Sequence, residues 1–202
     1  MINIRRTSRT LTKLLRHDKE GLHMTGDGYV CITELLSLPS MAKVTLQDLQ
    51  SIVVKDNKQR FTISKDTKIR ANQGHSLPQV QDEEIYTRIQ QASSLPLCIH
   101  GTYQDVLESI LEEGLSPMKR SHIHFAPSLS TVAGLRHSAN VHIYINVPLA
   151  MEEGIVFYRS SNNVILSRGN HSGVIPSHCF LKIVKYTKSW MSKEDGASGI
   201  IK

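Results

Sequence analysis

The polar stretch at residues 69–76, IRANQGHS, holds an arginine, two amides, a glycine, a histidine and a serine within eight residues. An arginine that leaves a strand beside a glycine suits an oxyanion, because the guanidinium donates several hydrogen bonds and the glycine lets backbone amides approach a ligand. A polar turn that binds nothing explains these residues equally well. Arg70 is therefore a first candidate for binding a phosphate.

A second candidate is the pair Arg16-His17, which ends the helix-like stretch SRTLTKLLRH. A helix dipole favours a protonated histidine at the C-terminal end, and the neighbouring arginine offers a fork of donors to a phosphate. Arg9 and Lys13 precede Arg16 at helical spacing and extend it into a basic stripe. A solvated helix end is the plain alternative.

A third candidate is the triplet His100-Gly101-Thr102, where the apolar strand-like stretch CIHGT ends before a helix-like one. A strand followed by glycine and a helix N-terminus is a usual place to hold a nucleotide, since backbone N–H groups and the helix dipole point at it. A helix start capped by Thr102 explains the triplet equally well.

A fourth candidate is the stretch KRSHIHF at residues 119–125. In a strand, His122 and His124 share one face with Arg120, and the apolar residues take the other face. Two histidines at this spacing can ligate zinc, but no third ligand has a metal-like spacing and no acidic cluster suits magnesium. An organic ligand or a structural role is favoured, and no metal is expected.

The elements around these candidates predict an α+β fold. In the first part of the chain a helix is expected after Thr7 or Ser8, another after Thr45, and a β-hairpin at residues 58–72. Helices followed by a hairpin of this kind predict a winged-helix-like module. Its hairpin carries Arg70.

The later part of the chain is predicted to be rich in strands. Residues 76–96 contain prolines and an acidic run and are expected to form a linker. One helix is expected near residues 103–115, with Val106, Ile110 and Leu111 on its apolar face.

Composition limits the class of protein. The chain has 202 residues, 40% of them hydrophobic, and its mean hydropathy is −0.22. No apolar run approaches the roughly 18 residues of a membrane span, and the N-terminal residues lack the apolar region of a secretory signal. Cys31, Cys98 and Cys179 form no C-x-x-C pair. This pattern predicts reduced, buried thiols in a cytoplasmic protein, or a nuclear one in a eukaryote.

Charge divides the chain unevenly. Residues 1–78 contain 13 Lys and Arg against 7 Asp and Glu, whereas residues 79–202 contain 11 of each. The whole excess of +6 therefore lies in the N-terminal part, as expected if that part meets a polyanion. Walker-type, G-x-G-x-x-G, G-x-S-x-G and H-E-x-x-H motifs are absent. The residues by themselves indicate a basic nucleic-acid-binding module joined to a strand-rich domain with polar turns.

Taken in order, these stretches resemble the RNA 2′-phosphotransferase family, NAD-dependent enzymes that remove the splice-junction 2′-phosphate from tRNA. Six stretches each match a block of that family's pattern: LTKLLRH, GLHMTGDGYVCITELL, QRFTIS with IRANQGHS, IHGTYQDVLESILEEGLSPMKRSHIHF, GLRHSANVHIYINV and GIVFYRSSNNVILSRG. The closing stretch at residues 169–180 matches it only loosely. The resemblance implies a winged-helix-like RNA-binding lobe at residues 1–90 and an ADP-ribosyltransferase-like, β-rich lobe for NAD at residues 91–202.

The resemblance also assigns roles to residues. The essential set of the family falls on Arg16, His17, Arg70 and Arg120. NAD binding is implied for His100, Gly101, Thr102, His122, His124, Arg136, Ser160 and Asn163, and which of His122 and His124 faces NAD stays open. Contacts with RNA are implied for Arg9, Lys13, Gln73 and His75.

The implied reaction has two steps and uses no metal. The RNA 2′-phosphate first attacks C1″ of the nicotinamide ribose, and nicotinamide leaves. The ribose 2″-OH then attacks phosphorus, releasing 2′-OH RNA and ADP-ribose 1″,2″-cyclic phosphate. The arginines are expected to clamp phosphate, and His17 to form a hydrogen bond or exchange a proton with a ribose hydroxyl.

Two other functions remain open at this point. One is an ADP-ribosyltransferase that modifies nucleic-acid phosphates and stops after the first step. The other is a non-catalytic winged-helix protein that senses NAD. A monomer that binds RNA and NAD but no membrane is expected in the leading interpretation.

Overall fold

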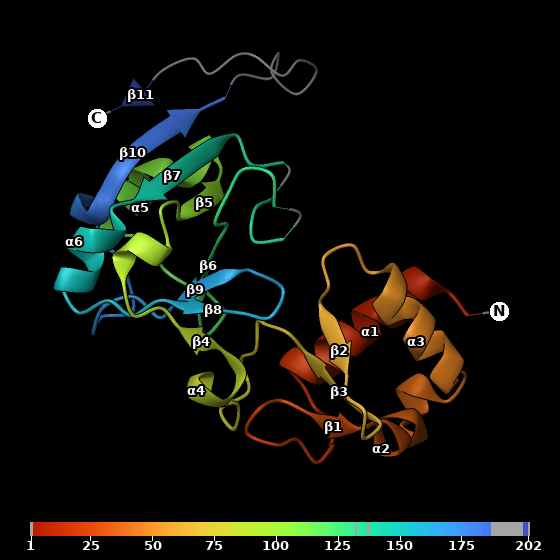
Figure 1. Ribbon diagram of the computed structural model, residues 1–202. Coiled ribbons are helices and arrows are strands. Elements are labelled where there is room, and N and C mark those ends of the chain that lie inside the picture. The colour runs from red at the N-terminus through yellow and green to blue at the C-terminus, as the bar shows by residue number, and fades with distance from the viewer. Residues whose placement is uncertain (1, 132, 137, 187–199, 202) are drawn as a thin grey trace. The chain divides into compact units, whose positions relative to one another are not determined.

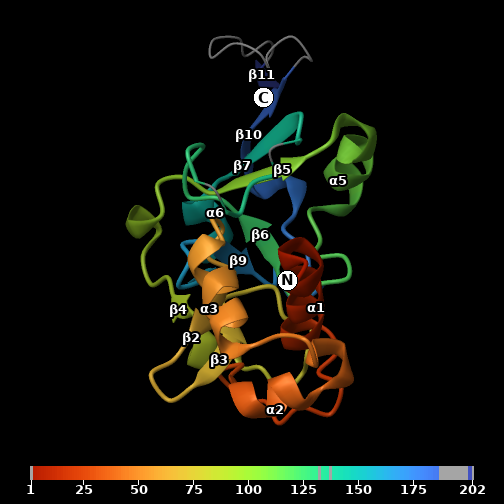
Figure 2. The ribbon, with the colours of Figure 1, turned by 90° about the vertical axis from the view of Figure 1, so that its right-hand side faces the viewer.

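The computed structural model describes residues 2–131, 133–136, 138–186 and 200–201. Its fold is α+β, as the sequence predicted, with helices and antiparallel sheets (Figures 1 and 2). The chain divides into two compact units. The first unit comprises Met1–Thr87 with Ser160–Asn162, and the second comprises Arg88–Arg159 with Asn163–Lys202.

The first unit is built on a three-stranded sheet of order β1-β3-β2. Helix α1 contacts β3, and helix α3 contacts β2. Its elements are α1 (Ile4–Arg16), β1 (Val30–Cys31), α2 (Ile32–Ser37), α3 (Leu46–Lys55), β2 (Phe61–Ile63), β3 (Lys68–Ala71) and the short α4 (Asp82–Ile85). The predicted hairpin is therefore present, and Arg70 of β3 pairs with Thr62 of β2.

Helix α1 begins earlier than predicted. Its N-cap is Asn3, whose side chain accepts a hydrogen bond from the Arg6 backbone, and not Thr7 or Ser8. A side-chain oxygen at the true cap satisfies an otherwise unpaired backbone N–H, so Asn3 can start the helix one turn upstream. The capping box of Thr45 and Asp48 is confirmed at α3.

The segment predicted as a linker folds into short elements. It contains α4, β4 (Thr87–Arg88) and a 3-10 turn, Ala92–Ser94. Ile85, Tyr86 and Leu95 are buried. The boundary between the two units lies between Thr87 and Arg88, inside the segment predicted as a linker. The buried apolar side chains anchor the segment, so it is folded and not an extended connection.

The second unit contains two four-stranded sheets with strand orders β11-β10-β7-β5 and β4-β8-β9-β6. Their strands are β5 (Ile99–Thr102), β6 (Ile123–Phe125), β7 (Val141–Ile145), β8 (Tyr158–Arg159), β9 (Ile165–Ser167), β10 (Phe180–Lys185) and β11 (Ile200–Ile201). Phe125, Ile143 and Phe157 belong to one buried core cluster that both sheets share. A bridge between Ile99 and Ala126 also links the sheets.

Two helices of the second unit position candidate residues: α5 (Leu107–Glu113) and α6 (Val147–Glu152). The apolar face predicted for α5 was partly wrong: Ile110 packs against the core, but Val106 and Leu111 are each 43% exposed, and Leu107 is the buried residue. A 3-10 turn, Gln104–Val106, precedes α5 and shifts its phase. Thr102 is not an N-cap; it ends β5 and is buried.

None of the helices in the described part of the chain has the length and apolar character needed to cross a bilayer. Cys98 and Cys179 are buried free thiols, as predicted, whereas Cys31 is exposed. Cys31 precedes α2 at its N-cap position, where its thiol meets solvent instead of the core.

Candidate active site

The end of α1 and the loop that follows β3 are joined by hydrogen bonds within the first unit. The Ser76 backbone N–H donates to the Arg16 carbonyl oxygen at 2.8 Å. The Ser76 hydroxyl lies 3.0 Å from Nδ1 of His17. Two stretches almost sixty residues apart in the sequence thus form one local structure, and the histidine ring is held by the loop.

Gly74 makes room for the Arg16 side chain in this structure. Its φ of +82° is a left-handed conformation, and a Cβ there would lie 3.2 Å from Nη1 of Arg16. The arginine is only 8% exposed. Burying a guanidinium costs free energy unless polar groups surround it. The close packing against Gly74 holds the Arg16 side chain in a defined orientation.

Arg70 is held from a different direction. Its Nη1 donates to the Asp27 carbonyl oxygen at 3.1 Å, and its guanidinium carbon lies 4.7 Å from the centre of the Tyr29 ring. Among the described residues its buried Nε has no hydrogen-bond partner. A buried charged donor without a partner is costly in the unliganded protein, which favours an anion as its partner. Sequence reasoning missed Asp27 and Tyr29, although the turn-forming GDGY stretch contains both.

Other residues of the 69–76 loop shape it. Asn72 is buried and bonds to the Thr62 hydroxyl and the Gln59 carbonyl oxygen, both at 2.7 Å. His75, expected to contact RNA, is 3% exposed and lies 3.2 Å from the Tyr86 hydroxyl through Nδ1. His75 is therefore buried inside the loop and supports its conformation. Gln73, also expected to contact RNA, is half-buried.

The basic stripe on α1 differs in detail from the prediction. Lys13 forms ion pairs with Asp18 at 3.0 Å and Glu20 at 3.7 Å, so its charge is partly compensated. The hydrogen bond with Asp18 raises the pKa of Lys13. Arg9 is exposed, and Arg5 continues the stripe one turn back because the helix starts at Ile4. The early helix start therefore adds one cation that sequence reasoning missed.

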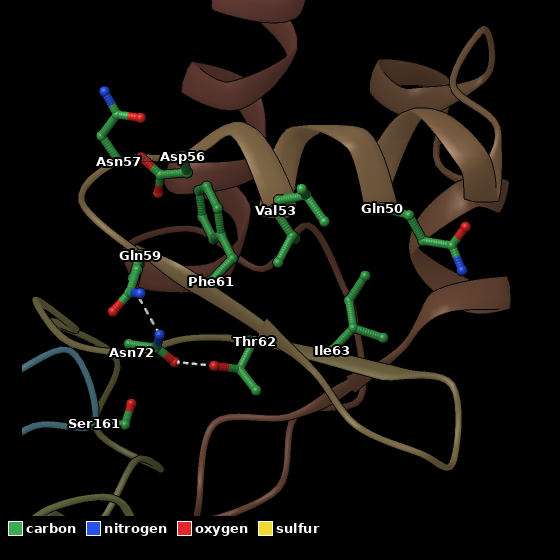
Figure 3. A pocket seen from close by; sticks show the side chains of 11 residues that line it. Gln50, Val53, Asp56, Asn57, Gln59, Phe61, Thr62, Ile63, Asn72 and Ser161 are labelled. Atoms are coloured by element: carbon green, nitrogen blue, oxygen red, sulfur yellow. Dashed lines mark hydrogen bonds between the residues drawn. The ribbon is translucent and has the colours of Figure 1, made fainter.

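A hollow of about 710 Å³ lies beside α3 and β2 in the first unit (Figure 3). Its lining is mainly neutral and polar, and it includes none of the predicted site residues. The lining comprises Gln50, Val53, Val54, Asp56, Asn57, Gln59, Phe61, Thr62, Ile63, Asn72 and Ser161.

In the second unit, His100 of β5 is held by β6. Its Nδ1 lies 2.9 Å from the carbonyl oxygen of His124, and its ring packs edge-on against Phe125. Burial lowers the pKa of His100 to about 4, and the charges of Arg136 and Arg120 act in the same direction. The imidazole is therefore neutral near pH 7, with its proton on Nδ1 and an acceptor at Nε2.

Arg120 and Arg136 form an exposed cationic corner near His100. Partial burial and the charge of Arg136 lower the pKa of the Arg120 guanidinium. The guanidinium of Arg136 lies 5.9 Å from the centre of the Tyr103 ring. The positive charges of Arg120 and Arg136 repel each other, and an anionic ligand bound there would reduce this repulsion.

The rest of the predicted triplet is in β5. Thr102 is buried, and a Cβ on Gly101 would lie 2.9 Å from Leu135 and 3.1 Å from Ala139. Gly101 therefore lets the segment that carries Arg136 approach β5 closely. This packing brings Arg136 to the strand that holds His100.

The two histidines of KRSHIHF differ in burial. His122 is 3% exposed, whereas His124 of β6 is half-buried and donates through Nδ1 to the His122 carbonyl oxygen at 2.9 Å. Ile123 and Phe125 point into the core, as the alternation predicted. His124 is thus the more accessible of the pair.

Ser160 and Asn163 belong to different units and support turns. The Ser160 hydroxyl donates to Asn162, whose amide donates to the Lys58 carbonyl oxygen, all within the first unit. Asn163 accepts a hydrogen bond from Arg159. Both predicted cofactor residues therefore already have structural partners.

Comparison with known proteins identifies the family. A family model described as RNA 2′-phosphotransferase, Tpt1 / KptA family, matches residues 3–169. The chain is 42% identical to the tRNA 2′-phosphotransferase 1 of Bos taurus, over 86% of this chain and 72% of that protein. It is 38% identical to the tRNA 2′-phosphotransferase of Saccharomyces cerevisiae, over 88% of this chain and 82% of that protein. It is 35% identical to the probable RNA 2′-phosphotransferase of Trichormus variabilis, over 79% of this chain and 88% of that protein. The chain therefore belongs to the RNA 2′-phosphotransferase family.

Proposed function

We propose that this member of an enzyme family transfers an internal 2′-phosphate from RNA to NAD. The first unit then acts as a winged-helix-like RNA-binding lobe, and the second as an ADP-ribosyltransferase-like lobe for NAD. The helices and hairpin of the first unit and the two antiparallel sheets of the second unit support this assignment.

One observation carries the proposal: the loop that follows β3, the strand of Arg70, contacts the end of α1, where Gly74 packs against Arg16 and Ser76 contacts His17. The unpartnered Nε of Arg70 fits a phosphate oxygen. Guanidinium groups bind phosphate through paired hydrogen bonds, which a lysine cannot reproduce. We assign Arg16 and Arg70 to the RNA 2′-phosphate.

His17 is suited to exchange a proton with a ribose hydroxyl. Its Nδ1 is bonded to the Ser76 hydroxyl, which sets the orientation of the ring. Positioned proton transfer of this kind typically contributes a factor of about 10² or more to a rate.

The second unit offers a set of groups that fits a dinucleotide. His100 is neutral and presents Nε2 as an acceptor for a ribose hydroxyl, while Arg120 and Arg136 supply charge for the pyrophosphate or the transferred phosphoryl group. When bound, NAD supplies an electrophilic ribose carbon with nicotinamide as its leaving group. The residues of this chain bind, orient and stabilise charge around that carbon.

RNA binding is proposed to extend along α1. Arg5 and Arg9 are exposed on one helix face and fit backbone phosphates of the RNA. Lys13 is expected to contribute less, because Asp18 and Glu20 already pair with it.

The test uses the purified protein, NAD and an RNA oligonucleotide with one internal 2′-phosphate. We expect nicotinamide release and conversion of the RNA to its 2′-OH form, and an oligonucleotide that already has 2′-OH serves as the control. Retention of the phosphate without nicotinamide release would contradict the proposal. Accumulation of ADP-ribosylated RNA without cyclic phosphate would instead favour the one-step transferase.

A further inference from the structure

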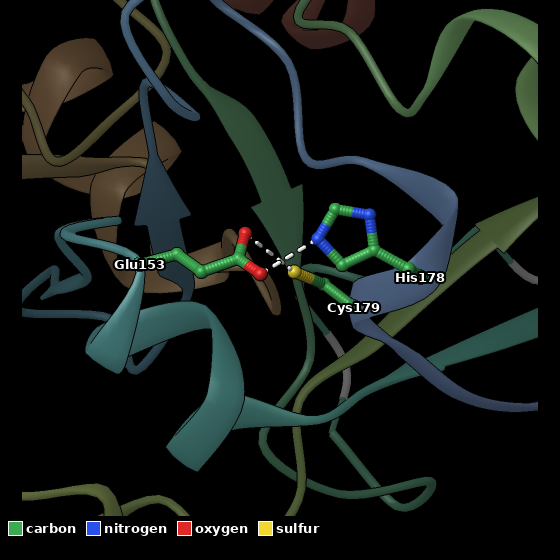
Figure 4. Close-up of side chains that lie close together, drawn as sticks. All are labelled: Glu153, His178 and Cys179. Carbon is green, nitrogen blue, oxygen red and sulfur yellow. Dashed lines mark hydrogen bonds and ion pairs between the residues drawn. The ribbon is translucent and has the colours of Figure 1, made fainter.

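Three side chains with different metal-binding atoms converge at one place in the second unit (Figure 4). They are Glu153 at the end of α6 and His178 and Cys179 in the 3-10 turn Ser177–Cys179. Their candidate ligand atoms lie within 4.8 Å of one another. In the part of the chain that the structure describes, this is the one such group of three.

Both oxygens of the Glu153 carboxylate are directed at the other two residues. Oε1 lies 2.7 Å from Nε2 of His178, and the Cys179 thiol donates to Oε2 at 3.5 Å. A buried thiol needs no polar partner, since it packs as a small apolar group. Packing of the core therefore does not by itself require the carboxylate of Glu153 or the imidazole of His178 to lie near the sulfur.

The backbone holds this arrangement from both sides. The Cys179 carbonyl oxygen accepts a hydrogen bond from Asn146 at 2.8 Å, and the Asn146 side chain caps the start of α6. Glu153 ends the same helix as its C-cap. Two of the three ligands are thus fixed to one short helix, and Cys179, with no exposed surface, is also held by the core.

The spacing suits a tetrahedral zinc ion. Bonds of about 2.3 Å to sulfur and about 2.1 Å to oxygen imply a sulfur–oxygen separation of about 3.6 Å. The Cys179 and Glu153 atoms are 3.5 Å apart. The sulfur distance is to Oε2 of Glu153, whereas Nε2 of His178 lies 2.7 Å from the other oxygen, Oε1. Binding therefore requires the imidazole and the carboxylate to turn, because a nitrogen–oxygen separation of about 3.4 Å is needed around a tetrahedral zinc ion. The side chains of His178 and Glu153 are 60% and 37% exposed, so they can turn and admit an ion from solvent.

We propose that Glu153, His178 and Cys179 bind one Zn²⁺ ion, with water at the fourth position. Binding displaces the thiol proton to solvent, and the resulting thiolate and carboxylate balance the two positive charges of the ion. Without metal, burial and the neighbouring Glu153 raise the pKa of Cys179 to about 11, so zinc must compete with this proton. The ion joins the end of α6 to the turn before β10, and the proposal is independent of the transferase reaction.

Cobalt(II) titration of the metal-free protein tests the site. Four-coordinate cobalt with a thiolate ligand absorbs strongly in the visible range and shows a sulfur-to-cobalt charge-transfer band. We expect both in the wild type and their loss when zinc displaces cobalt. The Cys179→Ser variant should lose the charge-transfer band, whereas Cys31→Ser, which removes an exposed thiol outside the group, should keep it.

His178→Ala provides a variant that leaves the core intact, because this side chain is exposed. We expect this variant to lose at least tenfold in cobalt affinity. Excess zinc should raise the Tm of the wild type by about 5 °C, and the variant should lose most of this rise. Absence of the charge-transfer band in the wild type, its survival in Cys179→Ser, or unchanged affinity in His178→Ala would each overturn the proposal. Transferase activity should persist after chelation, so a failure here is distinct from failure of the proposed function.

Discussion

The arginines of the two units are held in different ways. Arg16 and Arg70 of the first unit are fixed before any ligand binds, by Gly74 and by Asp27 and Tyr29. The pKa of Arg120 in the second unit is lowered by partial burial and by its cationic neighbour Arg136. The first unit thus presents preorganised guanidinium groups, and the second presents a cationic corner that an anion would stabilise. Preorganised donors contribute most to catalysis because they need little reorganisation.

The largest effect is expected for Arg70→Lys, which replaces one of the preorganised arginines of the first unit. A single ammonium cannot keep both the Asp27 contact and a bidentate phosphate contact. We expect kcat/KM for phosphate transfer to fall by a factor of about 10² to 10³. Arg88→Lys, the same change at an exposed strand position, serves as the control and should keep wild-type activity. Equal activities in the two variants would remove Arg70 from the site.

The stability of the protein at acid pH tests the lowered pKa of His100 in the second unit. The folded-state pKa of His100 is lowered to about 4 from 6.5, so the unfolded chain binds a proton more readily. The free energy of unfolding should therefore fall as the pH drops from about 6.5 to about 4, by about 3 kcal/mol from this residue. Urea unfolding at several pH values measures this slope. His100→Gln should flatten it, and an unchanged slope in that variant would contradict the assignment.

Gly74→Ala tests whether packing orients Arg16. The added Cβ meets the guanidinium, and the positive φ disfavours alanine by about 1 kcal/mol. Gly21→Ala is a matched control, because Gly21 has a φ of +86° and no atom within 4 Å of its Cβ position. Both variants should lose similar stability in thermal unfolding. Only Gly74→Ala should also lose activity, by about tenfold, and equal activities would show that Gly74 acts through the backbone alone.

The smallest effect is expected for Ser76→Ala. The backbone hydrogen bond to Arg16 remains, while the hydroxyl loses its contact with Nδ1 of His17 and its longer hydrogen bond, 3.3 Å, to the Arg16 carbonyl oxygen. A lost hydrogen bond of this kind costs about 1 kcal/mol, or roughly a fivefold fall in kcat. The pH dependence of kcat should shift with it if His17 transfers a proton. A fall in kcat without that shift would limit Ser76 to a structural role.

Part of the fold followed from local patterns. The leucines of α1, the capping box at Thr45 and the alternation of Ile123 and Phe125 each act within a few residues, so their outcome was predictable. The apolar face of α5 was not, because a 3-10 turn changed the helical phase. Segment 76–96 was predicted as a linker from its prolines and acidic residues, and it contains the boundary between the two units. Its short elements were not predictable, because its apolar residues meet their partners only in the folded chain.

The candidate site shows the same division. The residue types that suit phosphate were visible at Arg16, His17 and Arg70, together with the uneven charge of the chain. The support of Arg70 by Tyr29 was not visible, nor was the burial of His75. The Glu153–His178–Cys179 group was also missed, because 24 residues separate Glu153 from His178 and no regular spacing links them.

The sequence by itself determined the chemical types available and the family, since both depend on residue identity and order. Tertiary structure decided which of these groups are buried, which are already bonded and which have a polar atom left for a ligand. Those properties depend on contacts between distant segments, such as Gly74 against Arg16 and Cys179 against Glu153. Burial and hydrogen bonding set the charge state and orientation of a side chain, so the same residue types become either a site or a support.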